Sequence, residues 1–334
     1  MASSLTSHVD WLNLTREEVL EPELPICDAH HHFWNDGRDA DYLPADLVAD
    51  IQGTTGGSNN VVSSVFCEAS WNYRKEGPDP LRPVGETEAV AALTIPPGGR
   101  LAAAIVGMAD LRLGDAVGEV LDAHRAASSR FRGVRYWSTW DERPAQVGLR
   151  HVAPQGLLSD AAFRKGIAQL GRRKLSFDAW MLFPQLPDLA SLAAAFPDVT
   201  MVVGHFGGLV GIGPYANRAE TFAQWKKNIA LVAAHPNVVM KLGGVGIERV
   251  GHEFNKRDKP AGSLEVAEIF KPYVSECVEL FGPDRCLFES NFPVDKRALS
   301  YTVIWNAFKR ITQGFSSQER AALFRGTAER VYRL

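Results

Sequence analysis

Three consecutive histidines, His30, His31 and His32, end a short apolar run that begins at Cys27. Side chains alternate between the two faces of a β-strand, so we expect His30 and His32 on one face and His31 on the other. Two imidazoles on one face, at the end of a buried strand, can bind a metal ion or polarise a carbonyl group without one. The choice between these chemistries depends on which other polar residues share that position.

Polar residues end seven of the eight strands that the sequence predicts. The first strand supplies His30 and His32, and the others supply, in chain order, Glu68, Arg135, Asp178, His205, Lys241 and the group Glu289, Ser290 and Asn291, with Asp295 just beyond. A lone Asp or Lys in a strand is more often part of a structural salt bridge. Seven together are harder to explain in that way, since burying so many ionisable groups without partners would be costly.

Tryptophans gather at the same strand ends. Trp34, Trp71, Trp137, Trp140 and Trp180 fall at or just past the ends of the first, second, fourth and fifth strands. They could simply pack under the loops, or they could line a pocket for a substrate that has a ring or a large apolar part. In the second case Trp34, Trp71, Trp137 and Trp180 are substrate-binding candidates. Arg135 and Lys241 would then indicate a carboxylate or a polarised carbonyl on that substrate.

The order of the apolar runs indicates an α/β fold. Near-continuous apolar runs are typical of strands buried on both faces of a parallel sheet, and here they alternate with helical segments. The predicted strands are 26–34, 61–69, 102–110, 132–139, 175–182, 199–205, 237–243 and 285–291. Eight such units predict a (β/α)8 TIM barrel over residues 26–334, with an irregular arm at 1–25; a doubly wound open sheet is the alternative. Long connections follow four of the strands, on the face where barrels place active sites, at 35–43, 70–85, 140–157 and 244–261.

Composition excludes several classes of protein. The net charge of −3 argues against a nucleic-acid-binding protein, and the longest apolar runs are too short to cross a bilayer. Residues 1–25 carry six charged side chains and no apolar core of a signal peptide. The four cysteines form no CxxC pair, so we expect buried, reduced thiols in a cytoplasmic protein. The expected partner is a small-molecule substrate, and a homo-oligomer remains open.

Several motifs resemble the amidohydrolase superfamily, in particular the amidohydrolase-related family 2 of TIM-barrel hydrolases, which includes sugar-acid lactonases and the pyrone-dicarboxylate lactonase. The resemblance covers residues 26–334. It is carried by the segments Asp28–Trp34, Phe66–Glu68, Phe131–Arg135, Gly204–Gly207, Arg285–Asp295 and Leu323–Tyr332. It implies a lactonase-like hydrolase on a TIM barrel.

The resemblance also implies one or two divalent metals, held by histidines of the first, fifth and sixth strands and an aspartate of the eighth. His30, His32 and His205 match that pattern. Two positions depart from it, because Asn291 replaces the aspartate and Phe183 replaces a histidine. An amide is a poor substitute for a carboxylate, and a phenyl ring is no ligand. We therefore favour a site without a cofactor, with a single Zn²⁺ or Mn²⁺ on the three histidines as the alternative.

The hypothesis for the reaction is hydrolysis of a lactone, or of a related cyclic ester or amide. His30, His32 and His205 would donate hydrogen bonds to the carbonyl, and Arg135 would anchor a carboxylate or hold the oxyanion. Asn291 could orient substrate or water. Water activation needs a carboxylate, for which the candidates are Asp178, favoured here, with Glu68 and Asp295. The alternatives are a metal-dependent hydrolase or non-oxidative decarboxylase of the same superfamily, a lactone isomerase, and an inactive ligand-binding relative.

Overall fold

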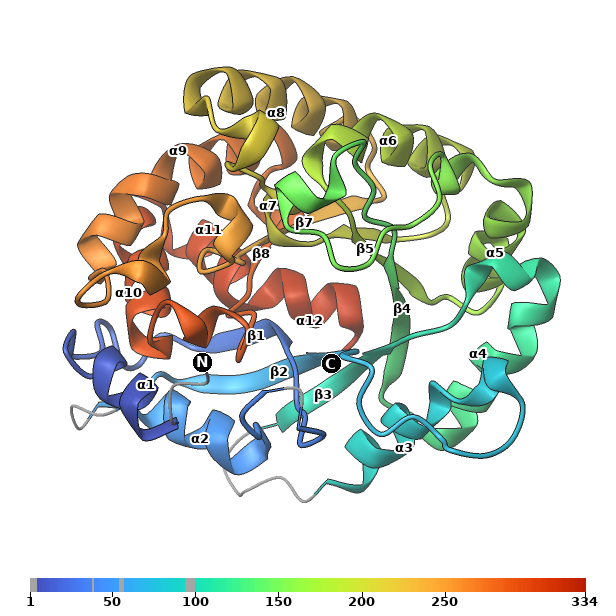
Figure 1. The fold of residues 1–334 in the computed structure, drawn as a ribbon, viewed down its shortest axis with the longest axis horizontal. Coiled ribbons are helices and arrows are strands. Elements are labelled where there is room, and N and C mark those ends of the chain that lie inside the picture. The colour runs from blue at the N-terminus through green and yellow to red at the C-terminus, as the bar shows by residue number, and fades with distance from the viewer. Residues whose placement is uncertain (1–4, 38, 54–56, 94–99) are drawn as a thin grey trace.

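A ring of eight parallel strands organises the chain, whose computed structural model describes residues 5–37, 39–53, 57–93 and 100–334. The strands follow one another around the ring in chain order, with the helices outside it (Figure 1). The strands are β1 Ile26–His31, β2 Val61–Cys67, β3 Arg100–Gly107, β4 Phe131–Trp137, β5 Ser176–Trp180, β6 Met201–Val203, β7 Val238–Leu242 and β8 Cys286–Phe288. The predicted (β/α)8 barrel is confirmed, because a doubly wound sheet would show a reversal of strand order.

The helices lie between the strands, and three more follow β8. They are α1 Leu5–Leu12, α2 Pro44–Gln52, α3 Val84–Ala92, α4 Val117–Ala127, α5 Ala161–Arg172, α6 Leu186–Ala195, α7 His205–Gly208, α8 Arg218–Ala233, α9 Ser263–Phe281, α10 Tyr301–Ile311, α11 Ser317–Ala321 and α12 Thr327–Tyr332. Side-chain caps start several of them: the Asp160 carboxylate accepts a hydrogen bond from the Phe163 N–H at the start of α5, at 2.8 Å. No helix among the described residues is long and apolar enough to span a membrane.

All eight strands are shorter than the sequence predicts, and β6 and β8 are shortened most, because the backbone turns there before the polar residues are reached. After β6, His205 and Phe206 have φ angles of 54° and 53°, in the left-handed region that bulky residues rarely occupy. After β8, Asn291 has a φ of 55°. The polar groups of these two units therefore lie on turns just beyond the sheet, where backbone strain is commonly found at functional sites.

The ring closes between β1 and β8 through residues at and just beyond the strand ends. The His32 N–H donates to the Phe292 carbonyl at 2.7 Å, and the Asn291 N–H donates to the His30 carbonyl at 2.9 Å. Beside them Asp28, fully buried, accepts hydrogen bonds from the N–H and hydroxyl of Ser290 at 2.8 and 2.6 Å and from the Tyr301 hydroxyl at 3.0 Å. Asp28 thus joins β1, β8 and α10 with one carboxylate.

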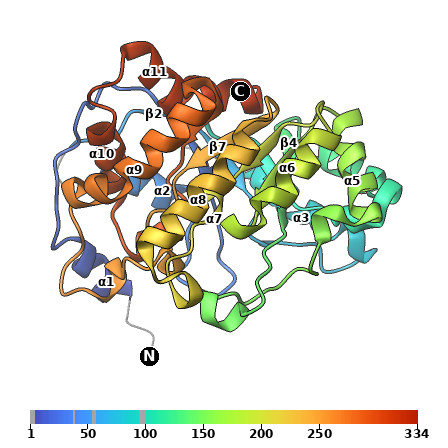
Figure 2. The same cartoon turned by 90° about the horizontal axis from the view of Figure 1, so that it is seen from above.

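Small apolar side chains fill the inside of the barrel, and the last helix covers one end of it. Figure 1 shows α12 lying across the centre of the ring, and Figure 2 shows the C-terminus at the opposite end of the barrel from α1. Side chains from β1, β2, β3, β6, β7 and β8 pack there against Ala328, Val331 and Tyr332: Cys27, Ala29, Val65, Cys67, Ala104, Val106, Val202, Val239 and Leu287. All four cysteines are free and buried, as predicted.

The N-terminal arm is not wholly irregular, contrary to the prediction, since it contains α1. The Trp11 indole N–H donates to the Arg257 carbonyl at 2.9 Å, in the connection after β7. Further along the arm, Lys309 of α10 donates to the Leu20 carbonyl at 2.6 Å. Because the partners in these hydrogen bonds are more than 240 positions apart, the sequence near α1 carries no sign of the contacts that hold the arm. Residues 1–4 of the arm lie outside the described residues.

The Asp28 carboxylate should be required for stability. In Asp28→Ala, the N–H groups of His30 and Ser290 lose a buried acceptor, so we expect the free energy of unfolding in urea to fall by more than about 2 kcal/mol. Asp28→Asn is the matched control, because its amide oxygen still accepts both N–H groups and its amide N–H can meet the two hydroxyls. Equal losses in the two variants would contradict this assignment.

Candidate active site

A small cavity lies where the polar strand ends meet. Its lining includes five of the residues predicted from the sequence as catalytic or substrate-binding groups, on four strands and the turn after β6: His30, Arg135, Asp178, His205 and Lys241. Trp180 and Gly204 complete one side of it. His32 and Glu68 lie directly behind, each hydrogen-bonded or paired to a lining residue. The predicted convergence is therefore present in the geometry, while the role of each residue remains a proposal.

A chain of hydrogen bonds fixes the first two histidines. The Lys241 ammonium donates to His30 Nδ1 at 3.3 Å, the Nε2 atoms of His30 and His32 share a hydrogen bond at 3.1 Å, and His32 Nδ1 donates to the Cys67 carbonyl at 2.8 Å. Burial, and then the nearby cations, hold the pKa of His30 and of His32 well below its usual range, so both rings are neutral. His31 faces away and contacts the Ser64 hydroxyl, as the alternation predicts.

Glu289 holds His205 in place. This carboxylate, fully buried, accepts from the His205 backbone N–H at 3.1 Å and from its ring Nδ1 at 2.6 Å. Burial would raise the pKa of Glu289, but the hydrogen bonds from His205 and the nearby Lys241 ammonium outweigh it and hold the pKa below its usual value. Burial also lowers the pKa of His205, so its ring is neutral. Because Nδ1 carries the proton given to Glu289, Nε2 of the neutral His205 ring keeps an electron pair.

Two glycines make room for this pair. A Cβ added to Gly243 would lie 2.2 Å from Cγ of Glu289, and one added to Gly244 would lie 2.8 Å from Cβ and Cγ of His205. Both distances are far below van der Waals contact, so any side chain there would displace the histidine or its carboxylate. The turn after β7 therefore has a glycine pair because the site is packed against its backbone.

Asp178, the favoured base at the level of sequence, is fully engaged by neighbouring side chains. Its Oδ2 accepts from the Lys241 ammonium at 3.1 Å and from the Tyr332 hydroxyl at 2.6 Å, and its Oδ1 accepts from the Ser176 hydroxyl at 2.8 Å. With three donors bound to its two oxygens, this carboxylate has few lone pairs free to bind a water molecule in the cavity. This geometry favours a structural ion pair for Asp178 and Lys241.

Arg135 and Glu68 form a second buried pair, surrounded by tryptophans. The Arg135 guanidinium donates to the Glu68 carboxylate and carbonyl, both at 3.1 Å, and the Trp137 indole N–H donates to the same carboxylate at 2.6 Å. The guanidinium lies 5.8 Å from the Trp137 ring and 5.5 Å from the Trp180 ring. Trp180 also contacts His205 edge-on at 4.8 Å. These two tryptophans are therefore placed to contact a substrate.

The remaining predicted residues lie near the cavity but do not line it. The Asn291 amide donates to Asp295 at 2.7 Å, and burial raises the pKa of Asp295 to about 8. Trp34 stacks beside His32 at 6.1 Å, and its indole N–H is bound to the Ala40 carbonyl. Trp71 is buried, with its indole N–H bound to Asn35. None of these four side chains is part of the cavity lining.

The histidines fit one divalent metal ion. The 3.1 Å between Nε2 of His30 and Nε2 of His32 suits two ligands of a single tetrahedral ion, and ligand atoms of His30, His205 and Glu289 lie within 4.8 Å of one another. Glu289 Oε2 is buried and lies 3.1 Å from His30 Nδ1, although it makes no hydrogen bond among the described residues. Sequence reasoning noted Glu289 at the end of the last strand without singling it out, although it restores, two residues earlier, the carboxylate that Asn291 lacks.

Comparison with known proteins gives a consistent picture. Residues 27–334 match the family described as Amidohydrolase. An uncharacterized protein of Sinorhizobium fredii is 33% identical over 93% of this chain and 99% of its own, and an L-fucono-1,5-lactonase of Burkholderia multivorans is 26% identical over 92% and 95%. Two crystal structures of an amidohydrolase from Burkholderia multivorans, one with HEPES and one with zinc, give TM-scores of 0.71 and 0.68 at 25% identity over 92% of this chain and 99% of theirs.

The ion pair of Asp178 with Lys241 should appear as a coupling energy. Asp178→Asn leaves a buried ammonium without its anion, so we expect a loss of about 3–5 kcal/mol in the free energy of unfolding. The double variant Asp178→Asn, Lys241→Met should have a higher free energy of unfolding than Asp178→Asn alone, because the unpaired Lys241 ammonium has been removed. Additive losses in a double-mutant cycle would rule out a structural pair and return Asp178 to the candidates for the base.

Proposed function

Because the chain belongs to the amidohydrolase family and is a hydrolase of that family, we propose that it opens the ring of a lactone, or of a related cyclic ester or amide, with water. The single observation that carries the proposal is the His205–Glu289 pair, which holds an imidazole electron pair at a cavity beside a buried arginine. The curated relatives that are 26% identical to the chain are named as lactonases, which supports this substrate class.

Water is activated by His205, acting with Glu289. As the water oxygen attacks the carbonyl carbon, His205 Nε2 takes its proton, and the imidazolium that forms is stabilised by the Glu289 carboxylate 2.6 Å from Nδ1. In this scheme a histidine replaces the carboxylate base expected from the sequence, for which the candidates were Asp178, Glu68 and Asp295, and a different carboxylate acts through that histidine. Glu289 does so as a positioning residue.

Negative charge on the carbonyl oxygen is stabilised by Arg135. Only one of its terminal nitrogens, Nη1, is bound to Glu68, so other N–H groups of the guanidinium remain to donate to the oxyanion. Neutral His205 cannot donate from Nε2, so the donor role expected for it passes to Arg135. When the ring C–O bond breaks, the His205 imidazolium returns its proton to the leaving oxygen, and an open-chain hydroxy acid results.

A metal-dependent hydrolase is the second candidate, favoured by the fit of the histidines to one ion and by the zinc in the related crystal structure. His30, His32 and His205 would hold a single Zn²⁺, which would supply Lewis-acid polarisation of the carbonyl. In that case Glu289 would fix the ring of His205 as a ligand, because a metal-bound histidine usually donates its second N–H to a carboxylate or carbonyl. The Glu289–His205 contact is needed in both schemes.

Removing the Glu289 charge should lower turnover without unfolding the protein. In Glu289→Gln the amide can still meet His205 but no longer stabilises an imidazolium, so we expect kcat to fall about 10²- to 10⁴-fold with a small change in KM. Glu279→Gln, an exposed glutamate of α9, is the control and should keep full activity. A Glu289→Gln variant with normal kcat would remove Glu289 from the mechanism.

The metal question has a direct test. We expect protein purified without chelators to contain much less than one equivalent of zinc or manganese, and to keep its activity on a panel of γ- and δ-lactones after dialysis against a chelator. Stoichiometric metal, with activity lost on chelation and regained with Zn²⁺, would establish the second candidate instead. Product analysis completes the assay, since a second lactone would indicate isomerisation and released CO₂ would indicate decarboxylation.

A further inference from the structure

One arginine that contacts Trp180, a residue of the cavity lining, has no anionic partner among the residues that the structure describes. Arg249 lies in the connection after β7, and its guanidinium is 5.5 Å from the centre of the Trp180 ring. Its Nη2 donates to the Gly148 carbonyl at 3.3 Å, whereas its Nη1 is buried and has no hydrogen-bond partner within the described part of the chain. Sequence reasoning did not single it out, because it follows the strand end by several residues.

The other charged groups of the site are all compensated. Arg135 is paired with Glu68 at 3.1 Å, and Lys241 is paired with Asp178 at the same distance. Glu289 is met by His205 at 2.6 Å. A cation that is partly removed from water without a carboxylate nearby loses hydration and gains no ion pair in return. Such a group is stabilised when an anion binds, which makes Arg249 the exception that needs a ligand.

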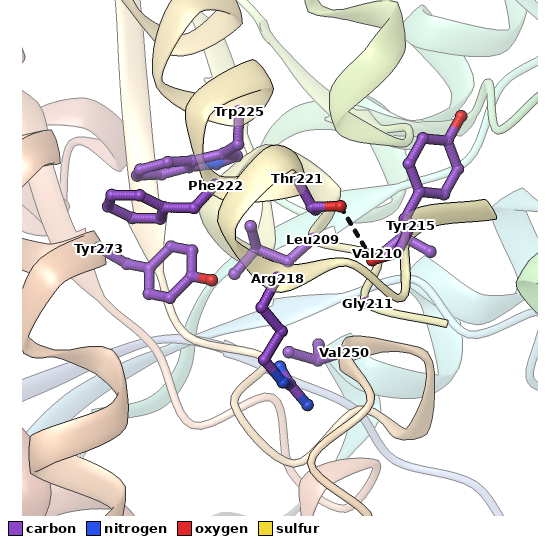
Figure 3. Close-up of a pocket in the computed structure, with 10 residues that line it drawn as sticks. All are labelled: Leu209, Val210, Gly211, Tyr215, Arg218, Thr221, Phe222, Trp225, Val250 and Tyr273. Atoms are coloured by element: carbon purple, nitrogen blue, oxygen red, sulfur yellow. Dashed lines mark hydrogen bonds between the residues drawn. The ribbon is translucent and has the colours of Figure 1, made fainter. Parts of the chain in front are cut away.

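The segment that carries Arg249 is held in place from behind. The Gly211 N–H donates to the Arg249 carbonyl at 2.8 Å, and Arg218 donates to the Gly251 carbonyl at 2.6 Å. Figure 3 shows Arg218 reaching from the start of α8 toward the segment with Val250, beside the aromatic side chains of Phe222, Trp225 and Tyr273. The backbone is thus anchored at Arg249 and two residues beyond it, and the guanidinium is held by the Gly148 carbonyl and the Trp180 ring, so an anion need not order this segment.

We propose that Arg249 binds a carboxylate on the substrate, so that the enzyme selects lactones that carry an acid group on the ring over neutral lactones. Two arginines contact one tryptophan, since Arg135 and Arg249 each lie 5.5 Å from the Trp180 ring. In the proposed division of work, Arg135 meets the reacting carbonyl and Arg249 meets the acid group. Guanidinium groups suit this task, because their planar N–H pairs match both oxygens of a carboxylate. The inference rests on the proposed function and names its substrate class.

Binding can be tested without turnover. The probe is tetrahydropyran-2-carboxylate, a six-membered ring acid that cannot be hydrolysed, and the matched neutral probe is tetrahydropyran-2-carboxamide. By calorimetry we expect the acid to bind the protein more tightly than the amide. Arg249→Met should weaken acid binding about 10- to 100-fold and leave amide binding unchanged. Arg249→Lys should recover part of the loss, and Arg172→Met, which changes an exposed arginine, should have no effect.

Kinetics then separate this inference from the proposed function. With a δ-lactone that carries a ring carboxylate, Arg249→Met should raise KM about 10- to 100-fold with kcat nearly unchanged, and the corresponding carboxamide lactone should be hydrolysed equally by both proteins. Equal KM values for the acid lactone, or an equal loss in Arg172→Met, would overturn the role of Arg249 and leave hydrolysis intact. Failure to hydrolyse either lactone, with acid binding still dependent on Arg249, would overturn the proposed function alone.

Discussion

A charge inside a protein must be met by an opposite charge or by hydrogen bonds, and the centre of this barrel is arranged around that requirement. Glu289 meets His205, Asp178 meets Lys241, and Glu68 meets Arg135, each pair joining two strand ends. Breaking any one pair would leave a desolvated charge, so the three pairs fix the positions of the groups between them. The groups to which we assign the reaction and substrate binding are the ones that this pairing leaves available: Nε2 of His205 and the remaining N–H groups of Arg135 and Arg249.

The architecture could be predicted from the sequence because its signals are local. A strand buried on both faces shows as a continuous apolar run, and a polar residue at the end of such a run shows directly which side chains will meet at the mouth of a barrel. His30, His32, His205 and Arg135 were identified in this way. The helix α1 was missed, since the groups that hold it come from the other end of the chain.

The roles at the site could not be predicted, because they depend on contacts between distant residues. Asp178 looks free in the sequence, yet the Tyr332 hydroxyl that binds it lies 154 residues away. Asn291 occupies the position where the family pattern has an aspartate, but the turn at this residue leads its amide to Asp295, and Glu289 supplies the buried carboxylate instead. The close packing of Gly243 against Glu289 and of Gly244 against His205 leaves space for this carboxylate, and that packing is visible in the structure but not in the sequence.

The position of α12 has a consequence for traffic into and out of the barrel. Since the last helix packs its Val331 and Tyr332 side chains into the end remote from the long connections, that end is filled in the described part of the chain, and the loop-bearing end is left for exchange of small molecules with bulk solvent. Substrate would then enter, and product leave, through the same opening, so product must dissociate before the next substrate molecule binds. The same helix ends at Tyr332, whose hydroxyl donates to Asp178. A change in the last residues of the chain would therefore alter the environment of Asp178 although none of the cavity residues had been substituted.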